Sequence, residues 1–181
     1  MRVFAKSNIF WRACQNAAVA AYSGAWIAWE GLDRIQFGAH SGGGSARRAI
    51  SGCNPMAIIG HGIDLVRIDR IATMIDKHGS HFLDRCFTAT EQAYCQDHSH
   101  PAQHYAGRFA LKEAVLKALG TGWRGQIAWT DIDAPRAASG RPVVILSGEC
   151  GRIAESLGIR RWHISISHAG DYAMASAVAE D

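Results

Sequence analysis

Acidic and basic side chains are interleaved in residues 108–122, RFALKEAVLKALGTG. Glu113 precedes Lys117 by four residues, an order in which a helix can form a surface ion pair worth a few tenths of a kcal/mol. The same pattern also suits a carboxylate that binds a metal ion beside bases that bind phosphate groups. Lys112 and Lys117 leave a helix about 140° apart, so they would contact different parts of a ligand. Arg108 lies one turn before Lys112.

A second carboxylate, Asp64, lies within the apolar segment HGIDLV. Charged side chains are rarely buried without a partner or a metal, although Asp64 alone is also explained by an exposed position on a strand. Taken together, Asp64 and Glu113 fit Mg²⁺, which binds one or two carboxylates plus substrate phosphates. The segment GTGWRG, residues 120–125, offers a glycine-rich backbone that can approach a phosphate. His168 lies where a predicted strand meets a turn, a place where a histidine is more often structural than catalytic.

The elements that would position these residues are strands and helices without a regular repeat. Apolar and β-branched residues predict a strand over 57–66, and helical spacing predicts a helix from residue 69 that Gly79 ends. Thr88 and Glu91 form the pattern of a capping box that opens a short helix through Tyr94. A long helix follows over 101–119, with a predicted buried face formed by Tyr105, Phe109, Leu116 and Leu119.

The second half of the chain reads mainly as strands. Residues 127–134 and 142–148 are predicted to be strands joined by a turn at Ser139-Gly140, followed by a short helix over 149–158. Two alternating runs around residues 169–171 predict a hairpin. The mixture of helices and antiparallel strands indicates an α+β fold.

Composition and charge restrict the function classes. The 181 residues suffice for one well-buried core, and five scattered cysteines without a C-x-x-C pair suit reduced thiols in a cytosol. Residues 1–55 carry six basic and two acidic residues, whereas the remainder carries thirteen basic and fourteen acidic ones. The nearly neutral remainder gives no basis for bulk nucleic-acid binding, and no apolar run is long enough to cross a bilayer. The histidine-rich segment HSHPAQH, residues 98–104, is expected to be solvated rather than to bind zinc.

Residues 1–55 differ from the rest of the sequence. An alanine-rich middle precedes a glycine- and serine-rich patch, and the pattern changes at Pro55-Met56. We expect these residues to be an N-terminal extension, either a non-native start upstream of a true start at Met56 or a disordered appendage with a flexible linker. A secretory signal is disfavoured because Arg12, Gln15 and Asn16 interrupt the apolar region. In each case the chemistry is expected within residues 56–181.

Four segments in order resemble the holo-[acyl-carrier-protein] synthase family of small bacterial 4′-phosphopantetheinyl transferases. They are GHGIDLVRIDRI, FTATEQAYC, GRFALKEAVLKALGTG and HISISHAGDYAMASAVAE, and they span nearly all of residues 56–181. The resemblance implies the 4′-phosphopantetheinyl transferase fold, a small antiparallel sheet packed with a long helix. It also implies transfer of 4′-phosphopantetheine from coenzyme A to a serine of apo acyl carrier protein, with release of 3′,5′-ADP, in fatty-acid biosynthesis.

The resemblance assigns roles to the residues identified above. Asp64 and Glu113 match the family's two Mg²⁺-binding carboxylates and, with Lys117, are the expected catalytic residues. Lys117, Arg108 and His168 match positions that contact coenzyme A phosphates, and Arg141 lies in a segment similar to the adenine end of the site. Either a metal-bound water or Asp64 itself would accept the serine proton, and the residues do not separate the two.

The family pattern also concerns partners. Arg70 and Met74 match a helix that docks the acidic recognition helix of the carrier protein, although Met74 could equally be a core residue. The resemblance further implies a cytoplasmic homotrimer with its active sites between subunits. His61, Trp123 and Ser167 depart from the usual residues without removing a metal ligand. A rival from another class is a non-catalytic module that binds coenzyme A or the carrier protein, for which two intact carboxylates would have little use.

Overall fold

The structure is a computed structural model that describes residues 57–181, and the expectations about residues 1–55 concern residues outside this range. In chain order the elements are β1 (Ile58–Arg67), α2 (Ile68–Cys86), α3 (Ala89–Gln96), α4 (Pro101–Ala118), a 3₁₀ turn η1 (Trp129–Asp131), β2 (Ile132–Asp133), β3 (Ile145–Leu146), α5 (Gly148–Ser156), β4 (Arg161–Ala169) and β5 (Tyr172–Glu180). Strands β1, β5 and β4 form one antiparallel sheet in that order, and β2 and β3 form a second small sheet. The predicted α+β class is confirmed.

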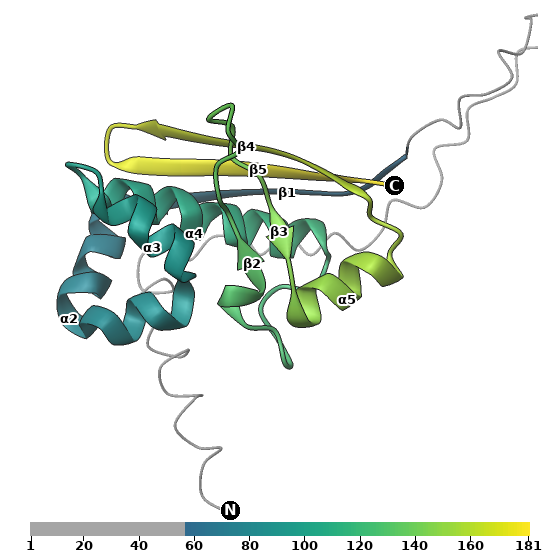
Figure 1. Cartoon of the computed structure of the whole chain (residues 1–181), viewed down its shortest axis with the longest axis horizontal. Coiled ribbons are helices and arrows are strands. Elements are labelled where there is room, and N and C mark those ends of the chain that lie inside the picture. The colour runs from purple at the N-terminus through teal and green to yellow at the C-terminus, as the bar shows by residue number, and fades with distance from the viewer. Residues whose placement is uncertain (1–56) are drawn as a thin grey trace, which may run out of the picture. The chain divides into compact units, whose positions relative to one another are not determined.

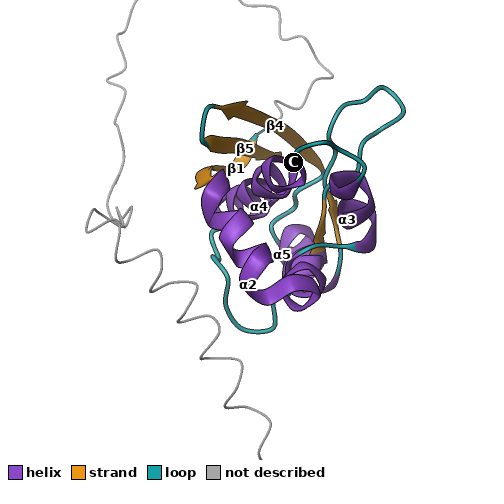
Figure 2. Cartoon of the chain, turned by 90° about the vertical axis from the view of Figure 1, so that its left-hand side faces the viewer, coloured by secondary structure: helices purple, strands orange, loops and turns teal. Residues whose placement is uncertain are grey.

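Helix α4 lies at the centre of this part of the chain. It packs against β1 and β5 on one side and contacts α2 and α3 on the other (Figure 1, Figure 2). Tyr105, Leu116 and Leu119 are buried as predicted, whereas Phe109 is half-buried. The prediction of a single apolar face was too narrow, because from Tyr105 onward the helix buries every residue except Phe109, Glu113 and Lys117, and even Arg108 and Lys112 are buried on it.

The sheet approaches α4 closely because the facing residues are the smallest available. A Cβ atom added to Gly60 would lie 2.0 Å from the Ala118 carbonyl oxygen, and one added to Gly62 would lie 1.9 Å from the Ala114 carbonyl oxygen. Strand β5 continues this surface with alternate alanines that are completely buried, Ala173, Ala175, Ala177 and Ala179. Side chains alternate between the faces of a strand, so these glycines and alanines form one flat layer against α4.

Several predicted boundaries are confirmed by the elements. The capping box forms, with Thr88 Oγ1 accepting from the Glu91 backbone N–H and Glu91 Oε2 accepting from the Thr88 N–H. The hairpin of β4 and β5 turns between Ala169 and Tyr172. Strand β1, helix α4 and helix α5 also lie within one or two residues of their predicted bounds.

One expectation about helices was partly confirmed and one about strands was wrong. Gly79, with φ 52° and ψ −135°, interrupts the helix as predicted, but a second helical segment of α2 continues to Cys86, and Phe82 and Cys86 are buried in the core. The two long strands predicted over 127–134 and 142–148 are instead the two-residue strands β2 and β3, in which Ile132 pairs with Leu146 and Asp133 with Ile145. Pro135 and Pro142 next to these pairs cannot donate to a strand ladder, which limits its length.

The contact between β1 and α4 can be tested by replacing Gly62→Ala. The new methyl group would overlap a backbone carbonyl that cannot rotate away, so we expect the free energy of unfolding to fall by about 3 kcal/mol or more. Urea unfolding followed by circular dichroism measures this change. Gly151→Ala is the matched control, because its Cβ would meet nothing closer than 3.6 Å and alanine favours a helix. Equal stability of the two variants would contradict the close packing.

Candidate active site

Asp64 faces α4 because it lies two residues beyond Gly62 on the same face of β1. Lys117 Nζ lies 2.9 Å from Asp64 Oδ1 and donates a second hydrogen bond, 2.8 Å long, to the Ile63 carbonyl oxygen. Lys117 therefore forms its ion pair across the β1–α4 contact rather than along its own helix. Two residues predicted as catalytic from distant parts of the sequence are brought together here.

Glu113 completes this group one helical turn before Lys117. Burial, together with the negative charge of Asp64, raises its pKa to about 7 against the opposing positive charges of Lys117 and Arg70. Burial also raises the pKa of Asp64, although Lys117 counteracts this effect. The effect of the Asp64 charge on the pKa of Glu113 indicates that the two carboxyl groups lie near each other.

This pair of carboxylates suits a hard divalent cation. Both ligands are oxygens. The raised pKa values of Asp64 and Glu113 indicate that two negative charges at this buried position are unfavourable without a positive charge beside them. Within residues 57–181 no group of three or more His, Cys, Asp and Glu side chains could hold a metal ion. The remaining coordination positions would thus belong to water and to phosphate oxygens, as is usual for Mg²⁺.

A cluster of basic side chains surrounds the ring of Tyr94, toward the N-terminal half of α4. The guanidinium carbon of Arg108 lies 3.9 Å from the centre of the Tyr94 ring, and that of Arg136 lies 4.9 Å from it. Arg108 is only 6% exposed, and its Nε has no hydrogen-bond partner within residues 57–181. A buried guanidinium N–H without an acceptor suits an anionic ligand.

Three histidines extend this cluster. The rings of His98 and His104 lie 4.2 Å apart, and His168 lies 6.0 Å from His104. Burial, together with the charges of the neighbouring histidines and arginines, lowers the pKa of His104 to about 4. The expectation of a solvated HSHPAQH segment was wrong for His98 and His104, which are half-buried because they stack with each other and with Tyr94.

Gly107 explains why His168 can reach this cluster. A Cβ atom on Gly107 would lie 2.8 Å from His168 Nε2, so only glycine leaves room for the imidazole beside α4. His168 Nε2 lies 3.1 Å from the Gln103 carbonyl oxygen, an arrangement in which the ring nitrogen donates. Gly107 is part of the GRF segment noted in the sequence, but its contact with His168 on β4 (Arg161–Ala169), about sixty residues further along the chain, could not be seen there.

The basic cluster includes an arginine, Arg136, that the sequence analysis did not single out, whereas the predicted Arg141 lies nearby on an exposed turn. Arg141 is exposed beside the tight turn at Gly140, and its carbonyl oxygen accepts from the Ala137 N–H. Arg136, on the other side of this turn, is the residue that reaches Tyr94. Sequence reasoning missed Arg136, because the strand pairing of Arg136 with Pro142 that orients it is a single isolated bridge.

Lys112 does not face a ligand, in contrast to the first interpretation of the two lysines. Its side chain is completely buried, and its Nζ lies 2.8 Å from Glu91 Oε2. Glu91 is also completely buried, and burial raises the pKa of Glu91 and lowers that of Lys112 against their mutual attraction. The capping-box pattern identified Glu91 as a helix-start residue but not as the partner of Lys112.

The two residues predicted to dock a partner, Arg70 and Met74, lie on the first turns of α2 and are half-buried. The charge of Arg70 lowers the pKa values of both Asp64 and Glu113, which places it near the carboxylates. This helix therefore borders the site.

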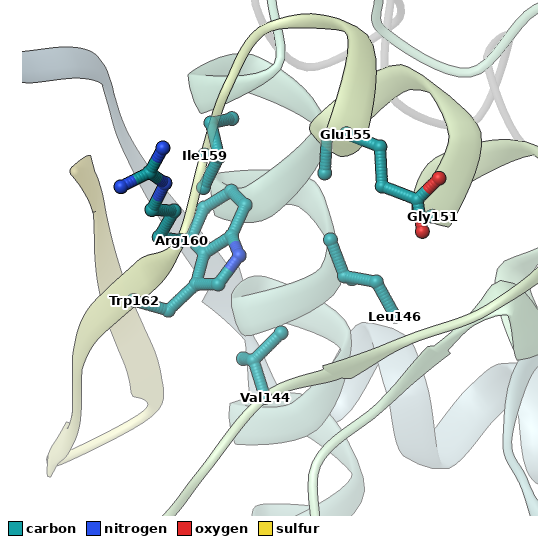
Figure 3. A pocket seen from close by; sticks show the side chains of 8 residues that line it. Val144, Leu146, Gly151, Glu155, Ile159, Arg160 and Trp162 are labelled. Atoms are coloured by element: carbon teal, nitrogen blue, oxygen red, sulfur yellow. The ribbon is translucent and has the colours of Figure 1, made fainter. Parts of the chain in front are cut away.

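A separate hollow lies away from the carboxylates, between β3, α5 and the start of β4 (Figure 3). It is lined by Val144, Leu146, Gly151, Ala154, Glu155, Ile159, Arg160 and Trp162. Its volume of about 170 Å³ is below the roughly 300 Å³ at which sites for drug-sized ligands begin. None of the predicted site residues lines it.

Comparison with known proteins gives one consistent family. The 4′-phosphopantetheinyl transferase superfamily matches residues 60–177. Holo-[acyl-carrier-protein] synthase from Koribacter versatilis is 44% identical over 124 residues, which cover 68% of this chain and 99% of the relative. The corresponding enzyme from Gloeobacter violaceus is 47% identical over 116 residues, or 64% of this chain and 87% of that protein.

Solved structures agree with the sequence comparison. Holo-[acyl-carrier-protein] synthase from Neisseria meningitidis superimposes with a TM-score of 0.64 at 34% identity and covers 69% of this chain and 100% of its own. The Helicobacter pylori enzyme, solved in complex with coenzyme A, gives a TM-score of 0.59 at 32% identity over 66% of this chain and 98% of that one.

The raised pKa of Glu113 predicts how the stability of the metal-free protein depends on pH. The folded chain holds this proton up to about pH 7, whereas the unfolded chain loses it near pH 4.5, so the stabilisation is complete below pH 4.5 and is lost as the pH rises through 7. Relative to Glu113→Gln, the free energy of unfolding of the wild type should fall by on the order of 2 kcal/mol between pH 5 and pH 7.5.

Urea unfolding in EDTA at the two pH values measures this difference. The comparison with Glu113→Gln is necessary because His104, whose pKa is lowered, makes the protein more stable as the pH rises from 4 to 6.5. Parallel pH profiles for the wild type and the variant would show that Glu113 is not perturbed.

Proposed function

This chain belongs to the 4′-phosphopantetheinyl transferase superfamily, as an enzyme of the holo-[acyl-carrier-protein] synthase type, and we propose that it transfers 4′-phosphopantetheine from coenzyme A to a serine of apo acyl carrier protein in fatty-acid biosynthesis. The observation that carries the proposal is the group formed by Asp64, Glu113 and Lys117 at the β1–α4 contact. Two carboxyl groups with raised pKa values beside an ammonium group suit a site that binds a divalent cation together with phosphate groups.

In this reaction the serine oxygen forms a bond to the β-phosphorus of coenzyme A. The bond from that phosphorus to the bridging oxygen breaks, the electron pair leaves with 3′,5′-ADP, and the serine proton passes to a base. Mg²⁺, when bound by Asp64 and Glu113, would neutralise charge on the phosphates and orient them. Lys117 adds a positive charge next to the same carboxylates.

The basic cluster around Tyr94 is proposed to bind the phosphate-rich end of coenzyme A. Arg108 and His168 were expected there from the family resemblance, and the contacts of Arg136, His98 and His104 with the Tyr94 ring add one guanidinium group and two imidazole rings. Along the helix axis, Arg108 lies about 7.5 Å from Glu113 at 1.5 Å per residue, so the two positions suit different phosphate groups of one ligand. Arg141 is exposed and remains a candidate contact for the adenine end.

Helix α2 is proposed to dock the carrier protein. Arg70 lies near the carboxylates and Met74 one turn further along, so a partner helix bound there would bring its serine toward the site. The resulting enzyme would act in the cytoplasm. None of the helices in residues 57–181 has the length and apolar character needed to cross a membrane.

The transfer reaction is tested by mass spectrometry of an apo acyl carrier protein after incubation with the full chain, coenzyme A and Mg²⁺. We expect the mass of one phosphopantetheine group to be added, and EDTA to prevent this. Asp64→Ala and Glu113→Ala should each lower turnover by at least 10³-fold, since each removes one of two metal ligands. Asp76→Ala, an exposed acid on α2, is the matched control.

The outcome also separates the enzyme from its rival. A chain that binds coenzyme A in an Mg²⁺-dependent way but modifies none of several carrier proteins would be the non-catalytic module. Near-normal turnover in either carboxylate variant would refute the metal assignment.

The face of the sheet opposite α4 supports the proposed homotrimer. It exposes apolar side chains from β1 and β5, among them Ile59, Ile63, Leu65, Tyr172 and Met174. Apolar patches of this kind on a soluble protein commonly mark an interface. A second copy on this face would place neighbouring subunits beside the β1 residues that follow Gly62.

Leu65→Glu tests this assembly, because it places a charge at the centre of the exposed apolar face. We expect the wild type to be a trimer by light scattering and the variant to be a monomer with at least tenfold lower transfer activity. Ile145→Glu, which alters an exposed isoleucine on β3, should change neither property. Full activity of a demonstrated monomer would contradict an active site shared between subunits.

A further inference from the structure

The buried pair of Glu91 and Lys112 joins segments that the transfer reaction uses but takes no part in the site itself. Both side chains are completely inaccessible, and the Nζ–Oε2 distance is 2.8 Å. A buried ion pair costs desolvation energy and is often no more stabilising than an apolar pair of the same volume. Its presence next to Glu113 therefore calls for an explanation other than stability.

The ammonium group of Lys112 has three protons and three acceptors. Besides Glu91, Nζ donates to the carbonyl oxygen of Trp129, 2.9 Å away, and to that of Ile132. These carbonyls belong to η1 and the start of β2, so Lys112 ties helix α4 to the segment that returns from the glycine-rich loop. Without the ammonium, the Ile132 carbonyl oxygen would lose this donor in the core, and the Trp129 carbonyl oxygen would keep only the Ile132 N–H.

The loop over 119–128 is consequently held at both ends by α4. Its first residues donate to the last turn of the helix, where the N–H groups of Thr121 and Gly122 reach the Leu116 carbonyl oxygen. Its far end is fixed by Trp129, whose ring stacks on Phe109 at 4.9 Å and whose carbonyl oxygen accepts from Lys112. Both Phe109 and Lys112 lie on α4 within one turn of Glu113.

The same loop contains a polar atom suited to a ligand. Thr121 Oγ1 is buried and has no hydrogen-bond partner within residues 57–181. Trp123 follows it and stacks in parallel with Trp129, with ring centres 6.4 Å apart. The position of Thr121 thus depends on a loop whose return end is set by Lys112.

We propose that Lys112 is a positioning residue for the transfer reaction. Through the carbonyls of Trp129 and Ile132 it holds the loop over 119–128 at the distance from Glu113 that coenzyme A requires. The inference rests on the proposed function for the identity of the ligand. Glu91 balances the charge of Lys112 in the core, whereas the two carbonyl contacts determine where the loop lies.

Three variants separate positioning from a merely structural role. Lys112→Met removes all three hydrogen bonds at similar volume, Glu91→Gln retains the carbonyl contacts, and the double variant Glu91→Leu with Lys112→Met replaces the pair by apolar groups. We expect the KM for coenzyme A to rise at least tenfold in both variants that lack Lys112, with the KM for the carrier protein within twofold of wild type. Glu91→Gln should keep the KM for coenzyme A within about threefold.

A spectroscopic readout needs no substrate. The indole rings of Trp123 and Trp129 are close enough for their transitions to couple, and when their in-plane transition dipoles are skewed this gives a paired circular dichroism band at about 230 nm. The band should disappear in the variants without Lys112 and persist in Glu91→Gln. Trp123→Phe, which removes the pair directly, assigns the band.

The outcomes discriminate between the hypotheses. The thermal stability of the double variant should exceed that of Lys112→Met, because no unpaired carboxylate is left in the core. A double variant that also recovers the wild-type KM and the indole band would overturn the proposal, as would a Glu91→Gln variant as impaired as Lys112→Met. If the wild type itself transfers nothing, the proposed function fails, whereas the indole band still decides whether Lys112 holds the loop.

Discussion

The direct contact between the backbone of β1 and the backbone of α4 determines the rest of this structure. At Gly60 and Gly62 the strand lies so close that a single methyl group would overlap a helix carbonyl oxygen. Asp64, two residues further along, is thereby brought within hydrogen-bond distance of Lys117, and its charge acts on Glu113. A wider separation would move Asp64 away from both Lys117 and Glu113.

The two sides of α4 use different physical means to fix the helix. Toward the sheet, packing of glycine and alanine sets the distance between the layers. Toward α3 and η1, the buried ammonium of Lys112 joins the helix to Glu91 and to the carbonyl oxygens of Trp129 and Ile132. Glu113 lies between these two sides, so its direction depends on both. Apolar packing on one side of α4 and the buried ion pair on the other therefore both influence where the Glu113 carboxylate lies.

Much of this arrangement could be predicted from residues 57–181, because local patterns carry it. The capping box of Thr88 and Glu91, the long helix and the terminal hairpin each have a short-range signal, and the motif spacing identified Asp64, Glu113 and Lys117. The extent of the burial of α4 could not be predicted, because its buried residues include Arg108 and Lys112 and do not form one apolar stripe. The burial of Lys112, the stacking of His98 and His104 and the approach of Arg136 depend on contacts between distant segments, for which one sequence contains no direct signal.

The alternate alanines of β5 carry a consequence for sequence variation in this protein. Ala173, Ala175, Ala177 and Ala179 are enclosed against α4, whereas Tyr172 and Met174 project from the opposite face. Side chains that face α4 along this strand therefore have almost no free volume, whereas Tyr172 and Met174 on the opposite face have ample room. Related sequences should consequently diverge here with a period of two, preserving the enclosed alanines while the intervening positions exchange freely among larger residues.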